Sequence, residues 1–416
     1  MASTILAIAL LYFLAHGATA LFTRTRVPDV LMLIVLGLIL GPVLDLLHPE
    51  DFGKVGPVMT TLALLVILFD SGTTLKIPDL KACMRDTTLL AVLSFLLTTA
   101  LAAGIAMALG GLEGMPALML GAAVGGSSSA VVIPIVRQLQ LGEPAATILI
   151  TESALTDVLT IVGLFSLLQA WEQGVMTVGP IVGGILSTLV LATMVGVAGA
   201  VLWLAFLTQI RRYPNTLTTT LAFALILYGV AELLGYSGAI AVLAFGIALA
   251  NQDELGITRL RIVDRHPTVL TDSEREFHGE LVFIFKIFFF VYLGLSMSFI
   301  PAEAILALVI VLAAYAGRLL VTRGLLSRKV PWTEARVVSY MVPKGLAAAV
   351  IAAIPLAAGV PGGEVIRDTV YQVVLLSILL TAGLVPAMET GVLRWGYRRL
   401  FGPFPEPEAP PPAESA

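Results

Sequence analysis

The chain has 416 residues, of which 58% are hydrophobic and only 12% charged, and its formal net charge is −4. A soluble domain carries about 25% charged residues, so this composition excludes an ordinary water-soluble globular protein. Most of the chain must face lipid or other apolar helices. The single cysteine, Cys83, excludes a disulfide framework and a multi-cysteine metal site.

Apolar runs recur along the whole chain, and most are long enough to cross roughly 30 Å of hydrocarbon as an α-helix. The sequence therefore predicts an all-α polytopic membrane protein with about thirteen transmembrane helices. The first run lacks a basic segment and a cleavage site, so we interpret it as a retained helix and not a signal peptide. The predicted spans are roughly 3–22, 28–47, 55–75, 87–109, 116–137, 145–170, 178–208, 216–234, 238–251, 280–299, 302–325, 335–357 and 367–394.

The distribution of basic residues predicts the orientation. Of the 24 Lys and Arg residues, 20 fall in one set of alternate connections, two fall in the other set (Lys54 and Arg367), and two lie within spans. Cytoplasmic connections carry an excess of Lys and Arg. The N-terminus is therefore predicted to lie outside and the C-terminus in the cytoplasm.

An odd number of spans allows two six-helix halves of inverted topology, joined by the seventh span, as in many transporters. The fifth span would then correspond to the twelfth, and both are interrupted by Gly, Ser or Pro. We expect residues 1–400 to form the transmembrane domain, with an ion-binding core bundle and a dimerisation scaffold. Residues 401–416 are rich in Pro and acidic, which predicts a disordered cytoplasmic tail.

The interruption of the fifth span reads Gly125-Gly-Ser-Ser-Ser-Ala-Val-Val-Ile-Pro134. Such residues can open a helix, and unwound backbone at bilayer depth is tolerated only where protein buries it or a cavity adjoins it. The alternative is a face of small residues for close helix packing. We favour the unwound segment, because the twelfth span repeats the interruption around Pro343-Lys-Gly345.

The sixth span contains two carboxylates, Glu152 and Asp157. A carboxylate at bilayer depth costs several kcal/mol, about 2.5–3.5 on insertion scales, so it needs a partner, a cation or a proton. Thr156, Asp157 and Thr160 share one helical face, with Ser153 one turn earlier, and such oxygens are the ligands that a small hard cation requires. The alternative for both carboxylates is a structural ion pair, which we favour for Glu152 and not for Asp157.

Three further charged residues lie within or near the spans. Lys286 stands among aromatic residues, which argues for an inward-facing charge over snorkelling. Lys344 lies at the interruption of the twelfth span, and Asp70 lies near the cytoplasmic end of the third, where it either caps the next segment or lines an access path. Two ion pairs would leave one carboxylate free, so a proton and a cation would compete for one site.

At these residues the chain resembles the monovalent cation:proton antiporter superfamily, of the sodium/proton exchanger type. The resemblance extends over about residues 5 to 395, and its motifs occur in order and at family spacing. The motifs are Leu68-Phe-Asp-Ser-Gly, Glu152-Ser-Ala-Leu-Thr-Asp157, Tyr228-Gly-Val-Ala-Glu-Leu-Leu-Gly-Tyr-Ser-Gly-Ala-Ile-Ala241, Phe288-Phe-Phe-Val-Tyr-Leu-Gly294 and Pro343-Lys-Gly-Leu-Ala-Ala-Ala-Val350.

The resemblance implies a thirteen-helix homodimer with two inverted repeats, whose crossed, broken helices match the fifth and twelfth spans. It implies that Asp157 binds the ion, and that Lys286 can pair with this site and tune it. Glu152 and Lys344 match a structural pair of a carboxylate and a basic residue, and Asp70 matches an acidic position near the cytoplasmic funnel. Family members carry Asn or Asp where this chain has Thr156. Because threonine carries a hydroxyl and no charge, Thr156 favours electroneutral exchange, whereas Lys286 favours electrogenic exchange.

The sequence thus predicts a secondary antiporter of the plasma membrane, with a prokaryotic inner membrane expected, that exchanges Na⁺ for H⁺ by alternating access. Li⁺ and K⁺ are alternative cations. We expect no enzyme activity, no cofactor and no nucleic-acid partner. The alternatives are a cation-coupled symporter of an organic anion and a passive cation channel. The predicted ion ligands, with Na⁺ at Asp157, are Asp157, Thr156, Ser153, Ser127, Ser128 and Ser129.

Overall fold

The computed structural model describes most of the chain, and all regular structure in the described residues is helical. This agrees with the predicted all-α class. The predicted first span lies largely outside the described residues, and so do Cys83 and the predicted tail 401–416. The described residues are 9–10, 12–17, 20, 28–53, 55–78, 85–174, 178–213, 216–260, 270–326 and 330–389.

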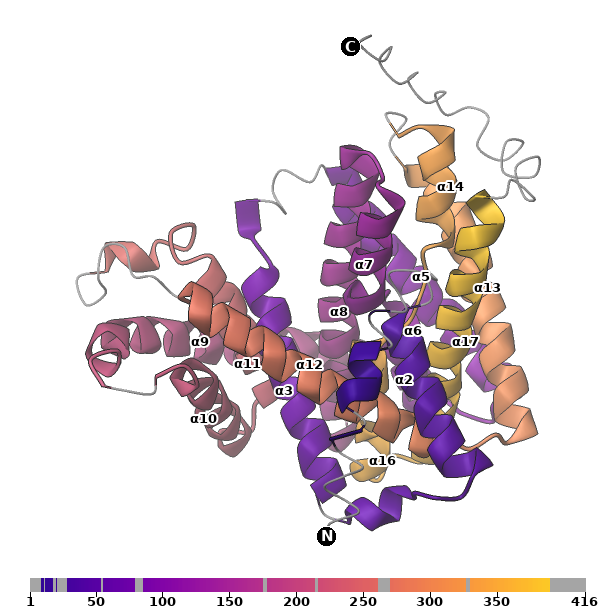
Figure 1. Cartoon of the computed structure of the whole chain (residues 1–416), viewed down its shortest axis with the longest axis horizontal. Helices are drawn as coiled ribbons and strands as arrows, with labels where there is room; N and C mark the ends of the chain where they lie inside the picture. The colour runs from indigo at the N-terminus through magenta and orange to yellow at the C-terminus, as the bar shows by residue number, and fades with distance from the viewer. Residues whose placement is uncertain are drawn as a thin grey trace.

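Seven helices of the described part are long and apolar enough to cross a membrane, and five shorter apolar helices accompany them. Their positions follow the predicted spans from the second to the last (Figure 1). The principal helices are α2 (Asp29–Leu38), which continues as a π-helical turn (Ile39–Val43), α3 (Val55–Thr74), α5 (Arg85–Leu109), α6 (Met115–Gly125), α7 (Ser129–Leu139), α8 (Glu143–Glu172), α9 (Val178–Ile210), α10 (Thr219–Leu233), α11 (Gly238–Ala250), α12 (Asp272–Leu295), α13 (Pro301–Leu325), α14 (Trp332–Tyr340), α15 (Leu346–Ile351), α16 (Ile354–Ala357) and α17 (Gly363–Glu389).

Both predicted interruptions are breaks in the helical backbone. In the first, α6 ends at Gly125, and Gly126 and Ser128 have extended backbone before α7 begins. In the second, α14 ends at Tyr340, and residues 341–345 are not helical before α15 begins. The alternative of one continuous helix with a small-residue packing face is therefore wrong for the fifth span.

The two breaks are in direct contact. The backbone N–H of Ser128 donates a 2.7 Å hydrogen bond to the carbonyl of Pro343. A Cβ atom at Gly345 would overlap the side chain of Ser128, so only glycine permits this approach. The hydrogen bond pairs an N–H and a carbonyl that have no partner within a helix. Buried backbone polar groups need such partners.

Helix α12 begins at Asp272, eight residues before the predicted start of its span. A capping box explains the earlier start, because Thr271 N–H donates to Glu274 Oε2 at 2.7 Å and Glu274 N–H donates to Thr271 Oγ1 at 3.2 Å. Arg211, just after α9, adds an ion pair to Glu274 at 2.5 Å. These bonds allow a polar turn to extend an apolar helix.

Most packing between helices lies within one of two groups, which we call, for position only, the scaffold set (α2, α3 and α9–α12) and the core set (α5–α8 and α13–α17). Glycines mark the closest packing between helices. In the α2–α12 pair, a Cβ atom at Gly37 or Gly294 would overlap the backbone of the other helix. In the α3–α11 pair, a Cβ atom at Gly72 or Gly246 would do so. Every close contact of a described glycine with another helix stays within one set. In Figure 1, α9 and α10 lie far from α13 and α14.

Candidate ion-binding site

Asp157 lies on α8 and faces the N-terminal end of α7. Its carboxylate oxygen Oδ2 accepts hydrogen bonds from the backbone N–H of Ser129 at 3.1 Å and from the Ser129 hydroxyl at 2.6 Å. The first N–H groups of a helix have no intrahelical partner, and the helix dipole places partial positive charge there. The break therefore supplies an environment that stabilises the ionised carboxylate without a full opposite charge.

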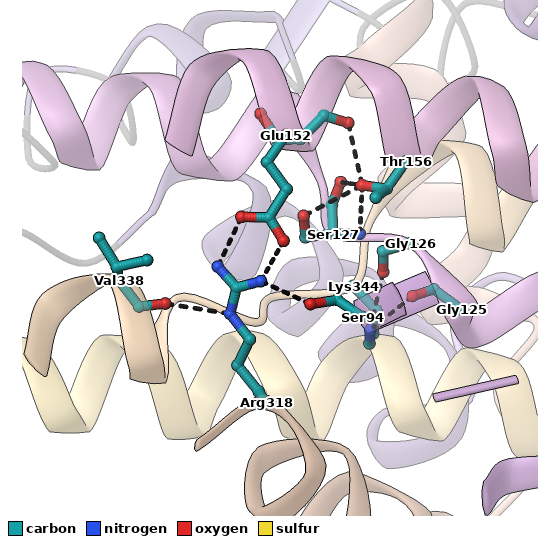
Figure 2. A network of polar contacts seen from close by, with 10 residues as sticks. Ser94, Gly125, Gly126, Ser127, Glu152, Thr156, Arg318, Val338 and Lys344 are labelled. Carbon is teal, nitrogen blue, oxygen red and sulfur yellow. Dashed lines mark hydrogen bonds and ion pairs between the residues drawn. The ribbon is translucent and has the colours of Figure 1, made fainter. Parts of the chain in front are cut away.

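Thr156 holds the other side of the same break. Its hydroxyl accepts a 3.1 Å hydrogen bond from the Ser127 N–H and lies 3.2 Å from the Ser127 hydroxyl (Figure 2). It also lies 3.3 Å from the carbonyl of Ser153, to which it can donate. The adjacent residues Thr156 and Asp157 thus bond Ser127, in the middle of the unwound segment of residues 126–128, and Ser129, directly after it.

A cavity of about 510 Å³ reaches Asp157 between the two helix sets. On the core side it is lined by Asp157, Ser128 and Ser129, and on the scaffold side by Asp70 of α3 and Lys286 of α12. It extends to Lys76, beyond the end of α3. Several of the polar residues that the sequence predicted for the ion site and its access path therefore line the same cavity, from its two sides.

Not every predicted ligand reaches this cavity. Ser153 is fully buried, and its hydroxyl donates to the carbonyl of Ile150 at 3.0 Å, so its bonds stay within α8. Lys286 does line the cavity, but its ammonium group is bonded to Asp29 Oδ2 at 2.7 Å. Its expected influence on Asp157 stays a prediction, and the ion pair that the structure shows is a different one.

The predicted pair of Glu152 and Lys344 is wrong. Glu152 binds Arg318 of α13, whose Nη1 contacts Oε1 and whose Nη2 donates to Oε2 at 2.5 Å. The guanidinium also donates to Ser94 Oγ at 2.9 Å and to the carbonyl of Val338 at 3.1 Å (Figure 2). Both charged side chains are at most 4% exposed. A bidentate guanidinium satisfies a buried carboxylate better than a single ammonium does.

Lys344 has a different partner. Its ammonium donates to the carbonyl of Gly126 at 2.8 Å and approaches that of Gly125 at 3.5 Å (Figure 2). Its own N–H donates to Ser377 Oγ at 2.9 Å. The C-terminal end of a helix carries partial negative charge and unpaired carbonyls. The second break thus caps the carbonyl end of α6 with a cation, while Asp157 caps the opposite end of the first break.

Sequence reasoning missed two functional candidates, Arg318 and Asp29. Arg318 was counted with the basic residues of a cytoplasmic connection, although it lies well inside α13 and is 4% exposed. The apolar residues on both sides of it were the available signal. Asp29 resembles an ordinary acidic residue in the first turn of a helix, so nothing local distinguished it.

Replacing Thr156 by valine is expected to destabilise the first break. The valine has nearly the same shape but cannot accept the hydrogen bond from Ser127 N–H, and an unsatisfied buried donor costs about 1–3 kcal/mol. Thr156→Ser keeps the hydroxyl and serves as the control. Thermal unfolding of the detergent-purified variants measures the difference, and equal stability of both would contradict this role for the hydroxyl.

The family model described as "Sodium/hydrogen exchanger, transmembrane" matches residues 8–390. The chain belongs to this family of membrane exchangers, which are not enzymes, and the resemblance seen in the motifs is confirmed. The long apolar helices agree with a multi-pass membrane protein.

The chain is similar in sequence to two curated relatives and in fold to one solved structure. The K(+)/H(+) antiporter NhaP2 of Shewanella sp. (strain ANA-3) is 24% identical over 86% of this chain and 61% of the relative. The K(+)/H(+) antiporter NhaP of Alkalimonas amylolytica is 24% identical over 90% of this chain and 64% of the relative. The chain thus spans less than two thirds of the length of these curated relatives.

The solved structure is that of the sodium proton antiporter MjNhaP1 from Methanocaldococcus jannaschii at pH 8. It matches with a TM-score of 0.73 at 22% sequence identity, and the match covers 94% of this chain and 98% of that chain. The likeness shows that the two proteins share a fold.

Proposed function

We propose that this chain is a secondary antiporter that exchanges a monovalent cation for H⁺ at Asp157. The observation that carries the proposal is the setting of this carboxylate: it lies on a cavity wall, at the N-terminal end of a half-helix. Among the described residues it forms no ion pair, so a cation or a proton can neutralise it. One carboxylate that holds either ion, but not both, is the minimal chemistry of exchange.

The transported cation is Na⁺ or K⁺ in this proposal, with Li⁺ as a further candidate. The relatives are named for K⁺ and the structural neighbour for Na⁺. Carboxylate and hydroxyl oxygens of Asp157, Ser128 and Ser129 line the cavity, and such hard ligands suit any of these cations. The hydroxyl groups of Ser127 and Thr156 support the site from behind the break.

Alternating access would move the core set against the scaffold set. The close glycine packing lies within each set, and the cavity lies between them. Helices in tight backbone contact resist separation, because no other atoms would replace the van der Waals contacts that they lose. The cavity extends toward Lys76, which the distribution of basic residues assigns to the cytoplasm, so this conformation faces inward. In the proposed homodimer the scaffold set would form the interface, with the N-terminus outside and the C-terminus in the cytoplasm.

Two matched helix crossings support the inverted repeats. In the proposed thirteen-helix arrangement, α2 and α3 are the second and third spans of the first half, and α11 and α12 are their counterparts in the second. Gly37 of α2 packs against α12, and Gly246 of α11 packs against α3. The pair α2–α12 thus corresponds to the pair α11–α3, as an internal two-fold axis requires.

Reconstituted vesicles test the function directly. Purified protein is placed in liposomes that contain a pH-sensitive dye and carry a proton gradient, and Na⁺, K⁺ and Li⁺ are added in turn. We expect at least one cation to drive proton movement across the vesicle membrane. The assay is run both with the membrane potential clamped and without a clamp. Proton movement that no cation drives, or cation flux that proceeds without proton movement, would refute the proposal and favour a channel.

A further inference from the structure

Lys286 and Asp29 form an ion pair that the exchange chemistry does not yet use. The Lys286 ammonium donates to Asp29 Oδ2 at 2.7 Å, and the two side chains are 20% and 14% exposed. The other oxygen, Asp29 Oδ1, accepts a hydrogen bond from Val30 N–H at 2.9 Å. Asp29 is the first residue of α2, so the positive end of the helix dipole stabilises its negative charge.

The position of Lys286 makes this pair consequential. Lys286 and Asp157 line the same cavity, and Lys286 also stands over the ring of Phe283, 5.4 Å from its centroid. A lysine side chain is a point charge on a flexible stem with many rotamers. An ammonium without its partner would seek another carboxylate on the cavity wall, and Asp70 and Asp157 are the two acidic residues there.

We infer that Asp29 is a positioning residue that holds the Lys286 ammonium away from Asp157 and so keeps Asp157 open to the transported cation. This inference rests on the proposed function. An ammonium at Asp157 would occupy the place of the monovalent cation, and it would be present at the high effective concentration of a tethered group. The scaffold set thus sequesters, through α2, the basic residue that its own helix α12 presents to the cavity.

Three variants, compared with wild type as the reference, separate positioning from a merely structural role: Asp29→Asn, Lys286→Gln and the double variant. Each is assayed in vesicles for the KM and the maximal rate of Na⁺- and K⁺-driven proton movement. Asp29→Asn is expected to raise the cation KM on the order of tenfold, a usual size for coupled sites, because the released ammonium competes at Asp157. The competition should appear in KM and leave the maximal rate at saturating cation nearly unchanged.

The double variant is the decisive one. Removal of Lys286 takes away the competitor, so the KM of Asp29→Asn with Lys286→Gln should return to that of Lys286→Gln alone. A KM that stays high in the double variant, or an Asp29→Asn variant with the KM of wild type, would overturn the inference. If Asp29→Asn does not fold, Asp29→Ser repeats the comparison with a side chain that still accepts a hydrogen bond at the start of α2.

The failure of this inference is distinguishable from failure of the proposed function. If wild type exchanges cations for protons and Asp157→Asn does not, the function holds whatever the Asp29 variants show. If Asp157→Asn exchanges normally, Asp157 is not the site, and the Asp29 inference fails with it.

Discussion

Replacement of Asp157 by asparagine is expected to reduce cation-driven proton movement to the background of protein-free vesicles. Asparagine can still accept the hydrogen bonds from Ser129, so the break should keep its shape. It can neither carry a negative charge nor bind and release a proton, so both transported ions lose their site. The measurement is dye-reported pH change on addition of Na⁺ or K⁺, with the same amount of reconstituted protein in each preparation.

Asp45→Asn is the matched control for this experiment. Its carboxylate is 85% exposed and lies beyond α2, away from the cavity. The same chemical change there should leave exchange at the wild-type rate. Exchange by Asp157→Asn at the wild-type rate would refute Asp157 as the ion site, and loss of exchange in both variants would show that the assay reports folding and not transport.

The second large effect is expected at Glu152. The change Glu152→Gln removes the charge that neutralises Arg318 and leaves a guanidinium buried in the core set. Breaking a buried ion pair by removing one partner costs about 3–5 kcal/mol. We therefore expect a large fall in the unfolding temperature of the detergent-purified protein. Intrinsic fluorescence recorded during heating measures this temperature.

The double variant Glu152→Gln with Arg318→Met distinguishes the lost charge from lost packing. It removes the unpaired charge as well as the pair, so it should recover a large part of the stability lost in Glu152→Gln. The exposed residue Asp51, changed to asparagine, is the control and should alter stability little. An unfolding temperature unchanged in Glu152→Gln would contradict a structural role for the pair.

The sequence alone could predict the breaks, and could single out Asp157 as a candidate, because both signals are local. Small residues and proline within an apolar run weaken a helix wherever it packs. A carboxylate such as Asp157 at bilayer depth needs compensation in any fold. The contact between Ser129 and Asp157 follows from two neighbouring spans, and both members were on the predicted list of ligands.

The partners of the other charges could not be predicted in this way. Glu152 is bonded to α13 and Lys286 to α2, and neither helix adjoins its partner's helix in the sequence. Which spans meet is decided by packing of the whole bundle, and one apolar helix face resembles another. The resemblance implies Lys344 as the partner of Glu152. In the fold the partner is Arg318, which the sequence assigns to a cytoplasmic connection.

If the chain exchanges ions as proposed, the Lys344 side chain limits the number of ions carried in one cycle. The first break contains two kinds of cation-attracting groups, the Asp157 carboxylate and the buried carbonyls of Gly125 and Gly126. The Lys344 side chain already bonds these carbonyls through its Nζ atom. Under the proposed function, and within the described residues, the break would then offer a place to one mobile cation, at the Asp157 carboxylate, and each cycle would carry a single ion.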